Sequence, residues 1–154
     1  MYSRNVERPI FLLVLLAALI TLVACSSADG ETESGADSIT NIIWQWESVT
    51  DKATGETTTV PDPENYTLVF RDDGTFSGEA DCNEISGTYT QEGGFFLTLG
   101  PSTMAFCGED SLDQLYLDLL NGVVAGGPAG DDRFALEWAA GEKRMEFIDG
   151  GAAK

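Results

Sequence analysis

From residue 42 onward, apolar and polar residues alternate with a period of two in several short runs. Successive side chains of a strand point to opposite faces, so each run predicts a short β-strand with one buried face. The expected buried faces are Trp44 and Trp46; Tyr66, Leu68 and Phe70; Phe76, Gly78, Ala80 and Cys82; Ile85, Gly87 and Tyr89; Phe95, Leu97 and Leu99; Phe134, Leu136 and Trp138; and a last strand from 144 to 148. Asp73-Gly74, Gly93-Gly94 and Gly141 supply the turn residues that hairpins require.

One segment has helical spacing instead. Its apolar residues recur at i, i+3, i+4, i+7 and i+8, and they are Leu112, Leu115, Tyr116, Leu119 and Leu120. Asp110 or Ser111 can cap the start and Gly122 can end the helix, while Asp113, Gln114 and Asp118 form the face expected to meet solvent. The pattern predicts a mainly β (α+β) fold: a small antiparallel barrel-like sheet of about 7–8 short strands, with one amphipathic helix covering an open end or edge.

The N-terminal residues have the pattern of an export signal. Arg4 and Arg8 precede an apolar run, 10–20, that is shorter than a membrane-spanning helix requires. The sequence Leu22-Val23-Ala24-Cys25 that follows resembles a bacterial lipobox, in which cleavage falls before the cysteine and the cysteine carries diacylglycerol. We therefore expect a lipoprotein signal peptide at 1–24 and lipidation of Cys25. An uncleaved anchor or an ordinary secretory signal is the alternative.

Residues 25–41 are rich in Ser, Gly, Thr and acidic residues, which predicts a lipidated acidic flexible tether. The expected location is the cell envelope, with the membrane contacted through the lipid on Cys25. Ser26 after the cysteine resembles the outer-membrane sorting class, which applies if the cell has an outer membrane. Otherwise the chain would lie on the outer face of the cytoplasmic membrane.

Charge and composition exclude several functions. The chain has 26 acidic and 8 basic residues, a formal net charge of −18 and no histidine. Nucleic-acid binding needs clustered Lys and Arg, so no nucleic-acid partner is expected. Without histidine there is no Ser-His-Asp or Cys-His catalytic pair.

The stretch FSGEADCNE, residues 76–84, concentrates carboxylates beside a cysteine. On the expected strand Glu79 and Asp81 point toward solvent, with no sign of the apolar pocket that a catalytic pair requires, so no catalytic residue is expected. Asp72, Asp73, Asp81 and Glu84 offer oxygen ligands, but their spacing does not fit a twelve-residue calcium loop. A solvated acidic face is the expectation, with no metal and no cofactor.

The other two cysteines are Cys82 and Cys107. Exported chains meet oxidising surroundings, which favours a disulfide between them over two buried free thiols. Gly78, within the same strand, would let another segment pass closely.

With these residues in place, the chain resembles the META domain family, the HslJ-like bacterial lipoproteins. The matching positions are Trp44, 66–70, 73–78, Cys82-Asn83, 87–89, 102–107, the helix, 134–136 and 145–147. The resemblance implies a mostly β barrel-like domain, placed at 42–150 before a short disordered tail at 151–154, and no catalytic residues. It also implies that the Asn83 amide satisfies backbone groups, and it carries a loose association with stress tolerance. Many relatives have Pro after the second cysteine and a basic residue before it, whereas Gly108 and Phe106 occupy those positions here.

Three functions follow from these features. The leading hypothesis is a non-catalytic, membrane-anchored envelope lipoprotein that serves as a binding or stress-tolerance module for an envelope protein or a cell-wall partner. The first alternative is a carrier of a small apolar ligand in the barrel interior, lined by Phe76, Tyr89, Phe95, Leu97, Trp138 and Phe147. The second is a protease or hydrolase inhibitor that presents the stiff loop 60–64, which contains two prolines.

Overall fold

The structure, a computed structural model, describes residues 38–138 and 141–154. The expected signal peptide, Cys25 and the tether up to residue 37 lie outside the described residues. The strands are β1 Ile42–Asp51, β2 Thr57–Thr59, β3 Tyr66–Phe70, β4 Thr75–Ala80, β5 Asn83–Thr90, β6 Phe96–Leu99, β7 Val123–Pro128, β8 Arg133–Trp138 and β9 Lys143–Ala152. The helices are the 3-10 helix η1 Pro63–Asn65 and the α-helix α2 Asp113–Asn121.

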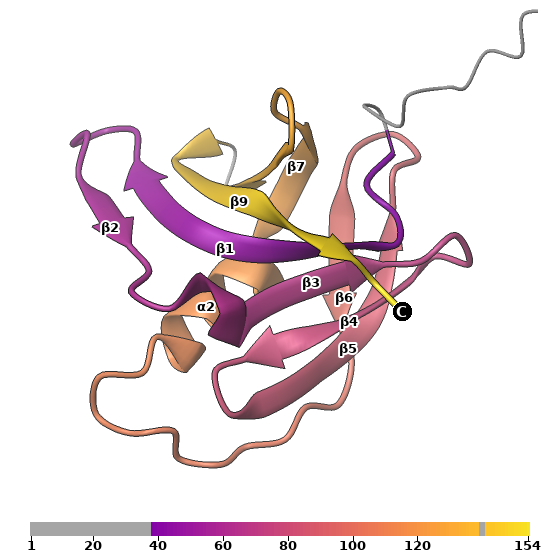
Figure 1. Ribbon diagram of the computed structural model, residues 1–154. Coiled ribbons are helices and arrows are strands. Elements are labelled where there is room, and N and C mark those ends of the chain that lie inside the picture. The colour runs from indigo at the N-terminus through magenta and orange to yellow at the C-terminus, as the bar shows by residue number, and fades with distance from the viewer. Residues whose placement is uncertain (1–37, 139–140) are drawn as a thin grey trace, which may run out of the picture. The chain divides into compact units, whose positions relative to one another are not determined.

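Eight strands follow one another in a single sheet in the order β6-β5-β4-β3-β1-β9-β8-β7, and β2 pairs only with β1 (Figure 1). All pairings between these strands are antiparallel. The two ends of the order, β6 and β7, lie beside each other, so the sheet curls into a nearly closed barrel. The predicted fold class is confirmed.

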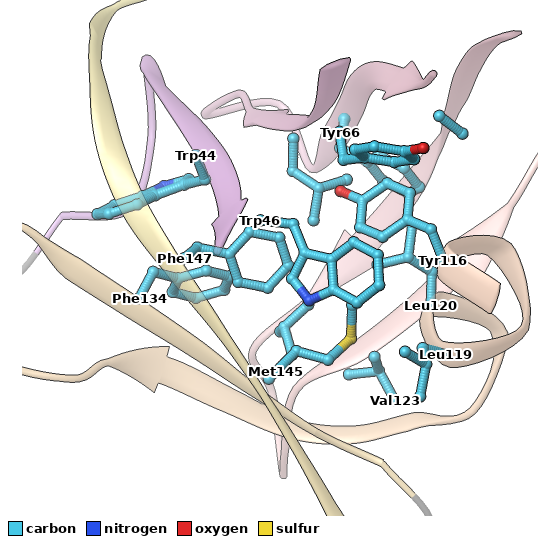
Figure 2. Close-up of a cluster of buried hydrophobic side chains, with 14 of the residues drawn as sticks. Trp44, Trp46, Tyr66, Tyr116, Leu119, Leu120, Val123, Phe134, Met145 and Phe147 are labelled. Carbon is cyan, nitrogen blue, oxygen red and sulfur yellow. The ribbon is translucent and has the colours of Figure 1, made fainter. Parts of the chain in front are cut away.

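The barrel interior is filled by aromatic and aliphatic side chains from nearly every strand. Trp46 is fully buried at the centre, where its ring stacks on that of Tyr116 at 5.0 Å and meets Tyr66 edge-on at 5.8 Å. Figure 2 shows Met145 and Phe147 beside this group, with Leu120 and Leu119 entering from α2. The helix therefore closes one end of the barrel, as its apolar spacing predicted, because burying this apolar surface is the dominant favourable term in folding.

The glycine-rich segment after the helix differs from the expectation. The alternating runs predict no strand there, but residues 123–128 form β7 and pair with β8. Alternation cannot reveal this strand because its residues are mostly small. At Gly126 a Cβ would lie 2.6 Å from Leu136 Cδ2 and 3.1 Å from Phe95 Cγ, so the absence of a side chain lets the barrel nearly close here.

The start of the helix also corrects the expectation. Asp113 was assigned to the solvent face, yet it is only 8% exposed, while Leu115, assigned to the core, is 37% exposed. The helix begins at Asp113, with Leu112 as its N-cap and no side-chain cap bond. Its first turn contacts β5 through the hydrogen bond that Asn83 Nδ2 donates to Asp113 Oδ2. A carboxylate in the first turn is also favoured by the helix dipole.

Candidate functional site: a pinned loop

The β4–β5 hairpin shifts the alternation at its turn. Ala80 pairs with Asn83, so Asp81 and Cys82 form a two-residue turn, and Asp81 has a left-handed φ of 59°. As a result Cys82 is exposed and Asn83 is buried. The expectation that Cys82 faces the core was wrong, because the turn interrupts the period-two pattern one residue before the cysteine.

Cys82 is joined to Cys107 by a disulfide, as the sequence predicted. Cys107 belongs to the 100–112 loop, which we define as the connection between β6 and α2. In Figure 1 this connection is the long segment that leaves β6 and returns to α2. The disulfide therefore fastens a long loop to the tip of a hairpin that is distant in sequence.

Asn83 fastens the same loop from inside. Its Oδ1 accepts hydrogen bonds from the Ala105 N–H at 2.7 Å and from Thr103 Oγ1 at 3.1 Å. Its Nδ2 donates toward the Ala105 carbonyl at 3.1 Å, Asp113 Oδ2 at 3.3 Å and Cys107 Sγ at 3.2 Å, three acceptors that share two hydrogens. The amide thus satisfies backbone groups, the role that the resemblance implies.

The two neighbours of Ala105 are highly exposed. Met104 is 86% exposed and Phe106 is 83% exposed. Both backbone polar groups of Ala105 are engaged by Asn83, which fixes the loop backbone between these two side chains. Single exposed apolar residues are ordinary, but two large ones on a doubly fastened loop form an apolar projection that marks a candidate binding site.

A shallow hollow of about 440 Å³ lies at the base of this projection. Met104 and Phe106 border it together with the acidic residues Glu109 and Asp113. Asp113 Oδ1 accepts a hydrogen bond from the Gln114 N–H at 2.7 Å, and Oδ2 faces Asn83, so the Asp113 carboxylate is already engaged. The Glu109 side chain is exposed and accounts for the remaining charge of the hollow.

The electrostatic surroundings of the loop are acidic. The sequence has no lysine or arginine between Arg71 and Arg133, a segment that contains the whole loop. Basic side chains elsewhere form ion pairs around β1, β8 and β9: Lys52 and Arg144 with Glu137, Arg133 with Glu47, Lys143 with Asp51, and Arg144 with Glu146. These pairs neutralise their own region of the barrel and leave the loop region negative.

The acidic residues of the FSGEADCNE region do not converge on one point. Asp73 Oδ1 accepts bonds from the Thr75 hydroxyl at 2.6 Å and the Thr75 N–H at 2.9 Å, and these bonds hold the pKa of Asp73 below its ordinary value. Glu79 and Glu84 stand opposite each other on β4 and β5. Within residues 38–138 and 141–154, no group of three or more His, Cys, Asp or Glu side chains is placed to hold a metal ion.

The six residues expected to line a ligand cavity pack against one another instead. Phe76, Phe95 and Phe147 are buried in the core, and Tyr89, Leu97 and Trp138 are partly buried against it. The Tyr89 and Phe95 rings stack at 5.9 Å, and Phe134 lies 5.7 Å from both Phe95 and Phe147. These side chains occupy the space in which an apolar ligand would have to bind.

The loop expected to act as an inhibitor is only partly free. Val60 is buried and its N–H donates to the Glu47 carbonyl, while Pro61, Asp62 and Glu64 are exposed. Residues 63–65 form the 3-10 helix η1. The segment connects β2 to β3 and is held to the barrel at Val60.

A second hollow, which the sequence did not suggest, lies on the outer face of the sheet. It has a volume of about 810 Å³ and extends over β1, β3, β4 and β5, with residues 101–103 of the loop as one wall. The outward-facing residues Gln45, Thr67, Glu79 and Ser86 contribute to its lining. Their mixed polarity carries no sequence signal that separates them from an ordinary solvated face.

The described residues form a small antiparallel β-barrel domain with one closing helix and a 100–112 loop that a disulfide fastens. The model of the META domain matches residues 37–149, and the chain belongs to the META domain family. This confirms the resemblance drawn from the sequence. The family is not known as catalytic.

Two solved structures share the fold. One is described as the NMR structure of the protein from Burkholderia xenovorans, with 23% identity and a TM-score of 0.58 over 73% of this chain and 83% of that one. The other is a crystal structure of a DUF4847 family protein from Bacteroides vulgatus, with 14% identity and a TM-score of 0.56 over 71% of this chain and 93% of that one. A search of curated proteins found no match. Across the residues that the structure describes, no helix has the length and apolar character needed to cross a membrane.

Proposed function

We propose that this chain is an exported, lipid-anchored envelope lipoprotein whose META domain is a non-catalytic binding module. The proposal of anchoring rests on the sequence Leu22-Val23-Ala24-Cys25, and the acidic segment after it would serve as the spacer. The proposal of a binding role rests on one observation: Met104 and Phe106 stand exposed on a loop that a disulfide and a buried asparagine hold in place. Neither side chain contributes to the core of its own domain.

A binding role accounts for these features better than ligand carriage or inhibition. The interior is occupied by aromatic side chains, and the 60–64 segment is anchored by the buried Val60. A rigid loop loses little conformational entropy when a partner binds, which is the physical advantage of fastening it beforehand. Attachment through acyl chains would leave the acidic domain free to meet a partner in the envelope rather than the bilayer itself.

Anchoring is tested in cells that express the full chain, by membrane fractionation together with incorporation of a fatty acid bearing an alkyne. The unchanged chain and a Ser27→Ala control should be labelled and sediment with membranes. Cys25→Ala should lose the label and leave the membrane fraction. A Cys25→Ala chain that stays labelled and anchored would rule out the lipoprotein.

Binding is tested in the same cells with a photoreactive amino acid placed at one position at a time. Position 104, at the exposed loop, should form a discrete adduct with an envelope component after irradiation. Position 54, which is exposed in the turn between β1 and β2, is the matched control and should form none. Identical patterns from the two positions would argue against a binding role for the loop.

A further inference from the structure

We propose that the 100–112 loop docks a basic protein segment, in which an arginine enters the hollow beside Phe106 and Glu109 while apolar neighbours of that arginine cover Met104. The inference rests on the proposed role as a binding module and adds the chemistry of the partner. Four observations support it: the exposure of the two apolar side chains, the fastening of the loop, the composition of the hollow and the charge of the surroundings.

The exposure of Met104 and Phe106 points to a partner that supplies apolar surface. Each side chain is more than four-fifths exposed, at 86% and 83%, whereas Phe96, another exposed aromatic, is only 45% exposed. Large side chains that project from a surface are the usual anchors of protein interfaces, where they enter pockets of the partner. Methionine suits this use because its flexible thioether adapts to different apolar surfaces.

The fastening of the loop shows that the projection is fixed before any partner arrives. The disulfide holds the loop three residues after Met104, and Asn83 holds both backbone groups of Ala105. A flexible loop could turn these side chains inward, but this backbone is held at Ala105 by hydrogen bonds and at Cys107 by the disulfide. The partner therefore meets a preorganised surface.

The hollow specifies the charge of the group that enters it. The exposed aromatic ring of Phe106 and the exposed carboxylate of Glu109 border the same hollow. A guanidinium group is attracted to the face of an aromatic ring and also pairs with a carboxylate, and its flat shape suits a shallow site. Asp113 adds negative charge at the base, although its oxygens are already hydrogen-bonded within the domain.

The charge of the surrounding surface also favours a positively charged partner. No lysine or arginine occurs from residue 72 to residue 132, so the loop and its neighbours repel acidic partners and attract basic ones. The same field works against contact between two copies of the chain through this loop. It also works against anionic lipid, which carries the same charge as the loop region.

The test uses the full chain, purified in detergent and immobilised, with a displayed library of random peptides of about twelve residues as the probe. We expect selected peptides to be enriched in arginine next to large apolar residues. A selected peptide should bind the Phe106→Ser chain about tenfold more weakly and the Glu109→Gln chain several-fold more weakly, as truncation of interface anchors typically does. Binding to the Phe96→Ser chain, which loses an exposed aromatic on β6, should stay within about twofold.

Failure to enrich arginine, failure to recover any peptide, or equal binding to all the variants would overturn the proposal. A lipid partner is examined with Phe106→Trp in vesicles that contain brominated phosphatidylcholine. Quenching beyond that of the unchanged chain would place the loop in the bilayer and overturn the protein partner. None of these measurements depends on where the chain is anchored. If the peptide selection fails but position 104 still forms adducts in cells, only the basic segment is rejected and the binding role of the loop stands.

Discussion

Tyr116 contains a buried hydroxyl group that has no hydrogen-bond partner among the described residues. The residue is fully buried, and this burial raises the pKa of the Tyr116 hydroxyl well above its ordinary value, so the group is neutral at every working pH. An unsatisfied buried polar group costs about 1–3 kcal/mol. Tyr116→Phe removes only that oxygen and keeps the ring that stacks on Trp46 at 5.0 Å.

We therefore expect Tyr116→Phe to raise the free energy of unfolding by about 1 kcal/mol, at the low end of that range because the vacated space is not refilled. For a domain of this size the melting temperature should rise by roughly 4 °C. Thermal and urea unfolding can be followed by tryptophan fluorescence, since Trp46 lies at the centre of the core beside this ring.

Tyr66→Phe is the matched control because it makes the same chemical change nearby. The Tyr66 hydroxyl accepts a hydrogen bond from the Leu112 N–H at 2.9 Å and donates to Asp81 Oδ2 at 3.4 Å. Its removal should lower stability by about 1–2 kcal/mol, since it leaves the partly buried Leu112 N–H without this partner. If Tyr116→Phe destabilises the chain as much as Tyr66→Phe does, the Tyr116 hydroxyl must have a partner and the reasoning is refuted.

Three further changes test other parts of the fold in the same unfolding assays. Gly78→Ala should cost about 3 kcal/mol or more, because the new Cβ would lie 1.9 Å from a backbone carbonyl oxygen of β3, whereas Gly127→Ala, with nothing within 4 Å, should be nearly neutral. Cys82→Ser should cost about 3 kcal/mol through loss of a cross-link between positions 25 residues apart, and added reductant should then have no further effect on that variant. Burial alone would raise the pKa of Glu137, but hydrogen bonds from a lysine and an arginine outweigh it and hold that pKa below 4.5. This stabilisation is present at neutral pH and lost as the pH falls through the folded pKa, so Glu137→Gln should lower stability by up to about 1 kcal/mol at pH 7 and by progressively less as the pH falls below 4.5 and through that folded pKa.

The strands of the barrel were predictable where large side chains alternate. Tyr66, Leu68 and Phe70 all face the core, as do Trp44 and Trp46, because one buried face imposes a period of two on the sequence. The closing helix was predictable for the same kind of reason, since its buried residues Tyr116, Leu119 and Leu120 recur at helical spacing. These elements are determined by local patterns, and a single sequence contains such patterns.

The strand β7 was not predictable, because its residues carry no alternating signal. Gly126 is glycine because Leu136 of β8 and Phe95, the residue before β6, approach it closely, and neither approach is visible locally. The face of Cys82 was misassigned for a related reason, since the turn at Asp81 interrupts the alternation of β4 before the cysteine. The burial of Asp113 likewise depends on Asn83, which lies 30 residues away.

The candidate site was visible in the sequence only as a departure from the family pattern at Phe106 and Gly108. That departure could not indicate exposure, because a methionine and a phenylalanine close to a cysteine are equally compatible with a buried loop. Their exposure follows from the contacts of Ala105 with Asn83, which join residues 22 positions apart. The pairing of the two cysteines was predictable. The sequence did not indicate that their disulfide would hold an exposed apolar loop in place.

The fastening of this loop bears on why its apolar side chains are exposed. A covalent bond and a buried asparagine stabilise the domain, yet folding alone gives no reason for the loop that they hold to project Met104 and Phe106 into water. Exposed apolar surface gains nothing from the hydrophobic effect and favours aggregation, so stability alone would select polar residues at both positions. The fixed backbone and the exposed side chains have a common physical explanation if the loop is held in shape for a partner.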